Sequence, residues 1–388
     1  MRRLAGWVAN LDNPAVVAAI ATIAAIAFVI ARVGVMAHWD ITRFIDVGTA
    51  FSNRRALPAG VTVSPGGGYD GQFYYRLALD PADLQRSAFG ITLDNPYRLQ
   101  RIAYSVTAWL AAGGQQRLIP DTLVAVNVLA FAALAWVSAL LARDCGRRAI
   151  WGLLVVGYFG FLFSVGRDLT EVCEMFLVVA ALVALRRGRA VLAGGLLAGA
   201  VLSRETALVV VVGIALVSLR SVIGRKRRLG RADMAWAFPA AAYVAWQLVI
   251  WSVAGSLPLR SDSEDNVTYP FLAMGNAVWH YFQQLPSQHA VIWFAEAVTV
   301  ALIVGLAAAS LRVSRASTEE KVSWTISLIL VLSLTKVIWS SHADFRGFED
   351  LYVLSIVILL DSNRRLGWIA ALAGVIWMAT FVHRVLLF

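Results

Sequence analysis

The stretch that decides the fold is AVVAAIATIAAIAFVIARVGVM, residues 15–36, which follows a basic start at Arg2-Arg3. A helix needs about 20 predominantly apolar residues to cross the hydrocarbon core of a bilayer, and this run supplies them. It is longer than the apolar core of a signal peptide, and further apolar runs follow it. We therefore expect it to be an uncleaved membrane anchor and the first of several spans.

The composition of the whole chain agrees with that expectation. Of its 388 residues, 59% are hydrophobic and 15% are charged, and the mean hydropathy is +0.69. A soluble domain has about 25% charged residues and could not bury so much apolar surface. Lipid is therefore the expected surroundings of most of the protein, and the bilayer is its first partner.

The basic residues set the expected orientation. The net charge is +10, and the basic residues gather in short clusters between apolar runs, which is the positive-inside pattern of cytoplasmic loops. This distribution argues against nucleic-acid binding. It predicts a multi-pass protein of the cell membrane with a cytoplasmic N-terminus. The clusters are Arg2-Arg3, Arg147-Arg148, Arg186-Arg187-Gly188-Arg189, Arg225-Lys226-Arg227-Arg228 and Arg364-Arg365.

The alternation of apolar runs and basic turns predicts an all-α polytopic protein of about eleven transmembrane helices in a single domain, 1–388. We expect two extracytoplasmic loops, at 37–120 and 256–288, with short amphipathic helices at 102–112 and 269–284. Cys145 and Cys173 fall at opposite ends of spans, too far apart for a disulfide. The predicted spans are 15–36, 121–142, 149–166, 170–185, 190–203, 206–220, 232–255, 290–311, 322–340, 351–361 and 366–386.

Unusual polar residues gather in the predicted outward turns, whereas the cytoplasmic turns hold mostly arginine. Carboxylates near hydrocarbon depth are costly and usually face a partner or a wet cavity. Arg167 with Glu171, and Arg346 with Asp350, have the spacing of helical ion pairs. Such groups either tie helix ends together or line a functional site. They are Asp40, Asp46, Asp70, Gln72, Arg98, Arg101, Arg167, Asp168, Glu171, Glu174, Arg204, Glu205, His342, Asp344, Arg346, Glu349 and Asp350.

The most distinctive segment is GGGYDGQFYYR, residues 66–76. Its glycines permit a tight turn or a close approach to a ligand, and Asp70 then opens a stretch with helical spacing. Aromatic rings such as Tyr74 can cover a sugar's C–H face, while the carboxylate accepts a hydroxyl proton. The alternative is that Asp70 caps a helix whose aromatic residues anchor it at the membrane interface.

A second segment, NPYRLQRIAY at residues 95–104, places Arg98 and Arg101 on one helical face. Guanidinium groups at the headgroup layer suit a lipid phosphate. The alternative is that both arginines extend to headgroups without binding a specific ligand.

These segments, GYDGQFYY at 68–75 followed by ALDP at 78–81 and YRLQRIAY at 97–104, resemble a group of bacterial multispanning proteins regarded as C-type (GT-C) glycosyltransferases. LSRET at 202–206 is a weaker match. The resemblance implies a GT-C-like fold and a sugar donor carried on a polyprenyl phosphate. It also implies inverting transfer to an extracytoplasmic glycan, lipid or protein acceptor.

The resemblance also implies residue roles. The catalytic base would be an aspartate of the first outer loop, which is Asp70 or, just beyond the first span, Asp40; the Asp-Gly-Gln motif favours Asp70. A divalent metal, Mg or Mn, is left open as a cofactor, and no metal ligand is assigned. The residues expected to contact substrate are Gln72, Tyr74, Arg98, Arg101, Tyr104, Glu171, Arg204, Glu205, His342 and Arg346.

Two other classes of function compete with a transferase. A membrane transporter or lipid flippase would place broken helices and ion sites at the membrane midplane, and the short, glycine-rich run 190–203 favours it. A non-enzymatic membrane subunit would use the outer loop for docking. Measuring uptake into vesicles alongside transfer of a radiolabelled sugar distinguishes a transporter from a transferase. A non-enzymatic subunit is identified if substitutions of Asp and Arg residues impair assembly without changing turnover.

Overall fold

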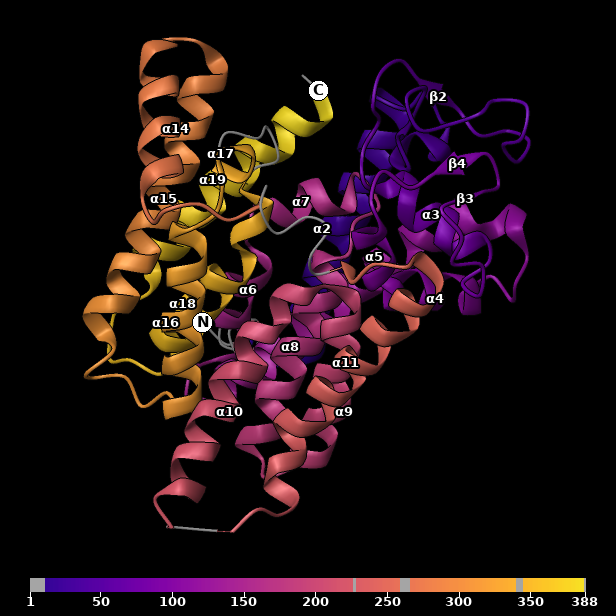
Figure 1. The fold of residues 1–388 in the computed structure, drawn as a ribbon. Coiled ribbons are helices and arrows are strands. Elements are labelled where there is room, and N and C mark those ends of the chain that lie inside the picture. Colours follow the sequence, from indigo (N-terminus) through magenta and orange to yellow (C-terminus); the bar gives the residue numbers. More distant parts are fainter. Residues whose placement is uncertain (1–10, 226–227, 259–265, 340–344, 387–388) are drawn as a thin grey trace.

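Long apolar runs become helices because a helix satisfies its backbone N–H and C=O groups within one segment, without water. The computed structural model describes residues 11–225, 228–258, 266–339 and 345–386 (Figure 1). Among those residues, six helical segments are long and apolar enough to cross a membrane. They are α2 (Pro14–Val35), η3–α5 (Gln116–Leu118, Ile119–Asp144), η5–α10 (Glu205–Ala207, Leu208–Ile223), η6–α11 (Arg231–Asp233, Met234–Ala254), α15 (Gln288–Ser310) and α19 (Gly367–Leu386).

Three shorter helices coincide with predicted spans: α8 (Glu171–Arg186), α9 (Ala190–Ser203) and α18 (Glu349–Leu360). The continuous span predicted over 322–340 is wrong, because α16 (Thr318–Leu332) ends at Leu332 and a separate short helix follows it. A helix rises about 1.5 Å per residue, so each is shorter than the roughly 30 Å hydrocarbon core. Every residue of α18 is buried, and α8 packs between α5 and α9. Helices α8 and α18 lie in the interior of the bundle, whereas α9 and α16 each expose one face, as at Val191 and Ile329. The short helices α14 (Leu272–Gln283) and α17 (Lys336–Trp339) lie beside α15.

The continuous helix predicted over 149–166 is wrong. The structure divides it into η4 (Ala149–Gly152), α6 (Leu153–Val156) and α7 (Gly160–Val165). The helix is interrupted at 157–159, between α6 and α7. Gly152, where η4 passes into α6, lies against α5, because a Cβ there would lie 2.4 Å from the backbone nitrogen of Ala139. The lack of a side chain at Gly152 lets the chain approach α5 closely at this point. The apolar sequence of 149–166 correctly predicted that this segment is buried, but it did not predict that the helix is interrupted.

The first loop is a folded layer at one end of the bundle, which we call the loop end (Figure 1). Two small sheets, β1 (Val47–Gly48) parallel to β2 (Val63–Ser64) and β3 (Ser87–Ala88) antiparallel to β4 (Ile91–Thr92), cover the short helices. Those helices are η1 (Ile41–Phe44), α3 (Gly71–Leu79), η2 (Pro96–Gln100) and α4 (Ile102–Ala111). All residues of α3 are buried, so it is a core helix of this layer and not an interfacial one.

The basic turns meet at the opposite end, which we call the basic end. Arg147 donates to the Leu360 carbonyl at 3.2 Å. Arg186 donates to both carboxylate oxygens of Glu320 at 2.8 Å and also pairs with Asp361. Four turns that the sequence assigned to one side of the membrane therefore lie together. The two cysteines are free, as expected for residues of different turns.

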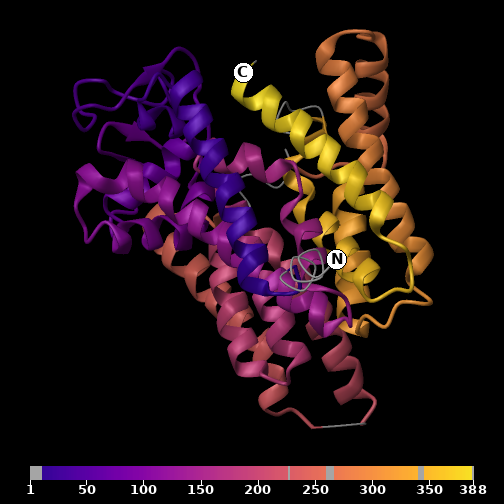
Figure 2. The same ribbon diagram turned by 180° about the vertical axis from the view of Figure 1, so that it is seen from behind.

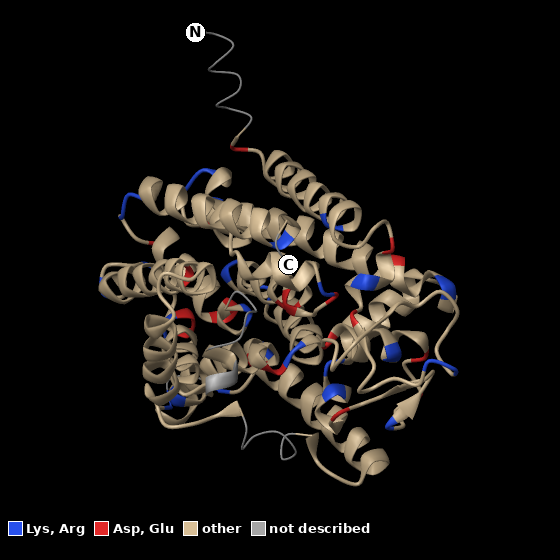
Figure 3. Cartoon of the chain, turned by 90° about the horizontal axis from the view of Figure 1, so that it is seen from above, with Lys and Arg blue, Asp and Glu red and all other residues tan. Residues whose placement is uncertain are grey.

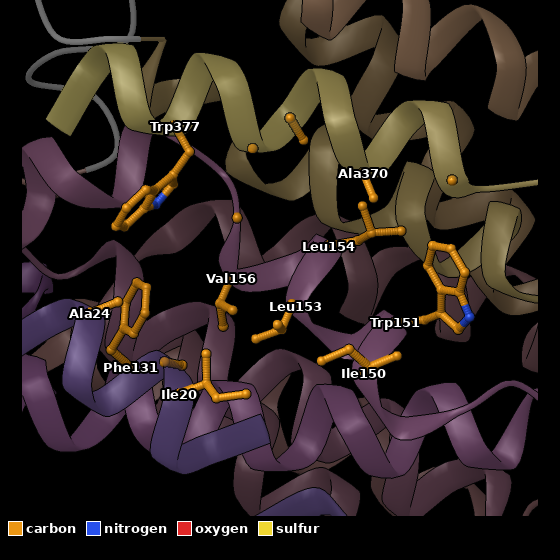
Figure 4. Close-up of a pocket in the computed structure, with 15 residues that line it drawn as sticks. Ile20, Ala24, Phe131, Ile150, Trp151, Leu153, Leu154, Val156, Ala370 and Trp377 are labelled. Carbon is orange, nitrogen blue, oxygen red and sulfur yellow. The ribbon is translucent and has the colours of Figure 1, made fainter. Parts of the chain in front are cut away.

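Helices α2 and α19 converge on one face of the bundle (Figure 2), where the rings of Phe28 and Phe381 meet edge to face at 5.5 Å. Between the other parts of these helices lies an apolar cavity of about 520 Å3. The broken segment supplies its floor through Leu153, Leu154 and Val156 (Figure 4). The cavity thus lies beside the interruption in the chain, with Val156 and Gly157 among its lining residues.

Candidate functional site

The Gly-rich loop fixes Asp70 against the bundle. Gly68 has a φ of +64°, and a Cβ on Gly71 would lie 2.4 Å from the carbonyl oxygen of Arg167. Gln72 secures the same turn, because it accepts from the Gly48 N–H at 3.1 Å and donates to the Gly67 carbonyl at 2.8 Å. The side chain expected to bind substrate is therefore engaged by the loop's own backbone.

Asp70 joins two arginines from distant parts of the chain. Its Oδ1 lies 3.0 Å from Nη1 of Arg98 and its Oδ2 lies 2.8 Å from Nη2 of Arg346. The backbone of Asp70 is already helical, whereas a capping residue is normally extended. Within the described residues its carboxylate makes no capping hydrogen bond, so the helix-cap alternative does not account for it.

Aromatic faces cover the two guanidinium groups that hold Asp70. The Arg98 guanidinium lies 4.9 Å from the centre of the Phe73 ring, and the Arg346 guanidinium lies 4.9 Å from that of Tyr69. Arg98 is also held by Asp94, through contacts of 3.0 and 2.9 Å. The cluster thus combines a carboxylate, two fixed cations and two aromatic faces in one place.

The electrostatics keep Asp70 ionised. Burial by itself raises the pKa of its carboxyl, but the positive charges of Arg98 and Arg346 outweigh burial and hold that pKa well below its usual range. For neighbouring Tyr69, burial raises the phenol pKa to about 12. At neutral pH this corner therefore presents a carboxylate and an un-ionised phenol.

Arg101 forms a second unit beside the first. It donates to Glu205 at 2.9 and 2.6 Å, to the Tyr74 hydroxyl at 3.0 Å and to the Tyr97 hydroxyl at 2.7 Å. Tyr97 in turn donates to Glu205. Arg98 and Arg101, expected to hold one ligand together, thus take different partners. Arg98 lies within the short η2 helix and contacts Asp70, whereas Arg101 directly follows that helix and contacts Glu205.

Arg204 forms a third unit, at the junction of α9 and α10. Its Nη1 lies 3.4 Å from Oε1 of Glu171 and 3.9 Å from Oε2 of Glu174, and it also pairs with Glu349. Nη1 of Arg346 lies 3.4 Å from the same Oε1 of Glu171. An unbroken chain of ion pairs therefore runs from Asp70 through Arg346, Glu171 and Arg204 to Glu349. Figure 3 views the molecule from the loop end and shows acidic and basic residues interspersed among the helices.

Two ion pairs expected from helical spacing are not the ones formed. Arg167 pairs with Asp46 of the first loop, and Arg346 pairs with Asp70 and Glu171. Asp168 has a φ of +50°, so the chain between Arg167 and Glu171 is not helical. Similarly, α18 begins only at Glu349, after Arg346. Both predictions extended a helix past its true start.

Asp40, the other candidate base, has a local role. Its carboxylate accepts hydrogen bonds from the backbone N–H of Thr42 at 3.0 Å and from the Thr42 hydroxyl at 2.7 Å, and these contacts cap η1. It also accepts a hydrogen bond from the Thr62 hydroxyl. Partial burial raises the pKa of Asp40, but the hydrogen bonds from Thr62 and Thr42 lower that pKa by more than burial raises it, so the net shift is downward. Among the described residues, Asp40 makes no ion pair with the Asp70 cluster.

Two further expected contacts lie elsewhere. Tyr104 is buried between α4 and α5, where it donates to the Leu123 carbonyl at 2.9 Å and accepts from Asn127 at 2.8 Å. His342 lies outside the described residues.

The structure also adds residues that sequence reasoning did not single out. Asp94 and Tyr97 each stand four residues before the arginine that they contact, a spacing that could have indicated them. Glu349 was noted only as one of several acids in its turn, and its pairing with Arg204 had no sequence signal because 145 positions separate them.

No protein-family model, curated protein sequence or solved structure matches this chain. The resemblance to the GT-C enzymes therefore rests on the residues alone.

Proposed function

We propose that this chain is a membrane glycosyltransferase that moves a sugar from a polyprenyl-phosphate donor to an acceptor hydroxyl outside the cytoplasm. The observation that carries the proposal is the meeting of Asp70 with Arg98 and Arg346, at 3.0 and 2.8 Å, beside the rings of Phe73 and Tyr69. A carboxylate can accept the acceptor's proton, and guanidinium groups can stabilise a leaving phosphate.

The reaction is a single displacement with inversion. The acceptor oxygen bonds to the anomeric carbon while the bond from that carbon to the phosphate oxygen breaks. Polyprenyl phosphate leaves with the bonding electron pair, and the acceptor's proton passes to Asp70. Because Asp70 is a weak base, proton transfer comes late, when the new bond has made the acceptor oxygen acidic. Arg98 and Arg346 stabilise the charge that develops on the phosphate.

An apolar pocket beside the cluster supports a lipid-linked donor. It has a volume of about 430 Å3 between α15, α16 and α18, and Trp293, Phe345 and Phe348 are among its lining residues. Phe345 and Phe348 flank Arg346 in the chain. A donor whose phosphate meets Arg346 could therefore place the first part of its isoprenoid chain in this pocket.

The first test separates the two candidate bases. Asp70→Asn and Asp40→Asn are prepared in full-length protein, and transfer of radiolabelled sugar from membrane lipids to acceptor is measured. Loss of a catalytic base typically costs about 10²–10⁴-fold in rate, and we expect this loss for Asp70→Asn. Asp40→Asn and the exposed control Asp121→Asn should keep most of the activity. Full activity in both the Asp70 and the Asp40 variant contradicts the mechanism.

Mass spectrometry of co-purifying lipid tests the substrate class independently. We expect a polyprenyl phosphate or its sugar ester with the wild-type protein, and less of it with Arg98→Gln or Arg346→Gln. Recovery of phospholipids alone, in the same proportions as in the membrane, argues against a polyprenyl donor.

One observation favours a transporter or flippase as the second candidate. The segment 149–165 is broken into three short helices beside the lateral cavity of Figure 4, and discontinuous helices are typical of transporters. Uptake or lipid transbilayer movement in proteoliposomes, without sugar transfer, would select this alternative.

A further inference from the structure

Three carboxylates converge at the starts of two interior helices. Glu174 belongs to the first turn of α8, and Glu349 and Asp350 open α18. One oxygen from each lies within 4.8 Å of the others. The exposed fractions of Glu174, Glu349 and Asp350 are 0, 0 and 5%. Like charges so close and so deeply buried repel one another unless a cation or protons compensate them.

The surrounding side chains compensate this charge only in part. Thr206 donates to Oε1 of Glu174 at 2.6 Å, and Arg204 pairs with Glu349. In the described part of the chain, the buried atoms Oε2 of Glu174 and Oδ1 of Asp350 receive no hydrogen bond. Among the described residues, Arg204 is the cation that forms ion pairs with this trio, and it also pairs with Glu171. A buried charge without such compensation strongly destabilises the folded state.

We propose that Glu174, Glu349 and Asp350 form a binding site for a divalent cation. Carboxylate oxygens are hard ligands, which select Mg²⁺, Mn²⁺ or Ca²⁺ over softer metals. Mg²⁺ and its ligand oxygens lie about 2.1 Å apart, so oxygens on one octahedral ion are separated by about 3.0 Å when adjacent and about 4.2 Å when opposite. The three carboxylate oxygens, which all lie within 4.8 Å of one another, would draw closer together around a bound ion. Water would complete the coordination sphere.

The cation would link α8 to α18 next to Arg204, at one end of the ion-pair chain that leads to Asp70. It would hold these two short helices together and fix the direction of the Arg204 guanidinium. The site goes beyond the proposed transferase and does not depend on it, because metal binding can be measured without any substrate.

The test uses full-length protein in nanodiscs, stripped with EDTA and titrated with Mn²⁺ while the electron paramagnetic resonance of free Mn²⁺ is followed. We expect one tightly bound Mn²⁺ per chain, displaced by Mg²⁺ or Ca²⁺. Loss of even an outer-shell partner of a metal ligand typically costs about 10–100-fold in affinity, and loss of a ligand should cost at least as much. We expect such a loss in Asp350→Asn and in Glu174→Gln. The control is Glu296→Gln, another buried acid, which accepts from Thr380 on α19.

Thermal unfolding keeps the test decisive if a variant is unstable. Mn²⁺ should raise the Tm of the wild-type protein and of Glu296→Gln, since a ligand that binds only the folded state stabilises it. Three results overturn the proposal: no Mn²⁺ bound by wild type at millimolar concentration, unchanged affinity in both cluster variants, or an equal loss in Glu296→Gln. The first of these would mean that protons compensate the trio.

Discussion

At the scale of single residues, Asp70 is an unusual candidate base because two guanidinium groups share it. Its contacts with Arg98 and Arg346 leave it ionised far below neutral pH. A carboxylate of this kind is always ready to accept a proton but has little intrinsic basicity. Its environment therefore suits a reaction in which the acceptor oxygen becomes acidic before it loses its proton.

The pH dependence of activity should report this arrangement. The folded-state pKa of Asp70 is lowered, so the wild-type kcat/KM should show no acid limb from this group above about pH 4, its ordinary pKa. Arg346→Gln removes one cation and leaves burial to raise the pKa, so the rate should fall as the pH drops through a higher value. Profiles of kcat/KM between about pH 4.5 and 8 measure this. Arg117→Gln, at an exposed position, serves as control, and coincident profiles for wild type and Arg346→Gln would contradict the assignment.

Arg101 and Glu205 should behave as a buried pair. Removal of one partner of such a pair costs about 3–5 kcal/mol, whereas replacement of both by apolar side chains is often nearly neutral. We therefore expect Arg101→Met and Glu205→Met each to lower the free energy of unfolding strongly, and the double variant to recover most of the loss. A double-mutant cycle from denaturant unfolding tests the coupling. Additive losses would mean that Tyr74 and Tyr97 hold these groups independently.

At the scale of elements, α3 positions the site because it is buried on every side. It lies against α4, where Ser105 donates to the Tyr74 carbonyl at 2.9 Å. The start of α3 meets the backbone ahead of α8 at Gly71. A helix held at Gly71 and Tyr74 gives Asp70 a defined position relative to arginines from other elements.

Gly71→Ala should release that fixed start. The added Cβ would lie 2.4 and 2.8 Å from the carbonyl oxygens of Arg167 and Ile45, so backbone must move. Overpacking of this kind costs about 1–3 kcal/mol, and transfer activity should fall with it. The matched control is Gly67→Ala, whose Cβ would find its nearest neighbour, Phe51, at 3.9 Å. Equal Tm values for the two variants would show that the turn is not tightly packed.

At the scale of the whole molecule, charge is sorted between two ends. The loop end holds the Asp70, Arg101 and Arg204 units, and the basic end holds Arg147, Arg186 and their carbonyl and carboxylate partners. Because basic turns favour the cytoplasm, this sorting predicts that the first loop lies on the other side of the membrane.

Cysteine labelling tests that orientation. On a background with Cys145 and Cys173 replaced by serine, single cysteines are introduced at Ala59 and Leu229, which are exposed near the loop end and the basic end. An impermeant maleimide applied to intact cells or spheroplasts should label the Ala59→Cys variant. It should label Leu229→Cys only after permeabilisation. The reverse pattern would overturn the assigned topology.

The sequence determined the helical, membrane-embedded character of the protein and the positions of most of its helices. Both follow from local quantities, namely the length of an apolar run and the charges that bound it. Residues 190–203 were predicted as a helix with the same limits that α9 has in the structure. The sequence also identified Asp70, Arg98, Arg204 and Arg346 as polar residues worth explaining.

Only the tertiary structure decided how those residues combine. Asp70 and Arg346 are separated by 276 positions, and the folding of the first loop over the bundle, not any periodicity, brings them together. Likewise, the close approach of Gly152 to the backbone of Ala139 on α5 is a contact that only the folded chain shows. Ion pairing and backbone contact act over a few ångströms in space, so a pattern of neighbours along the chain could not specify them.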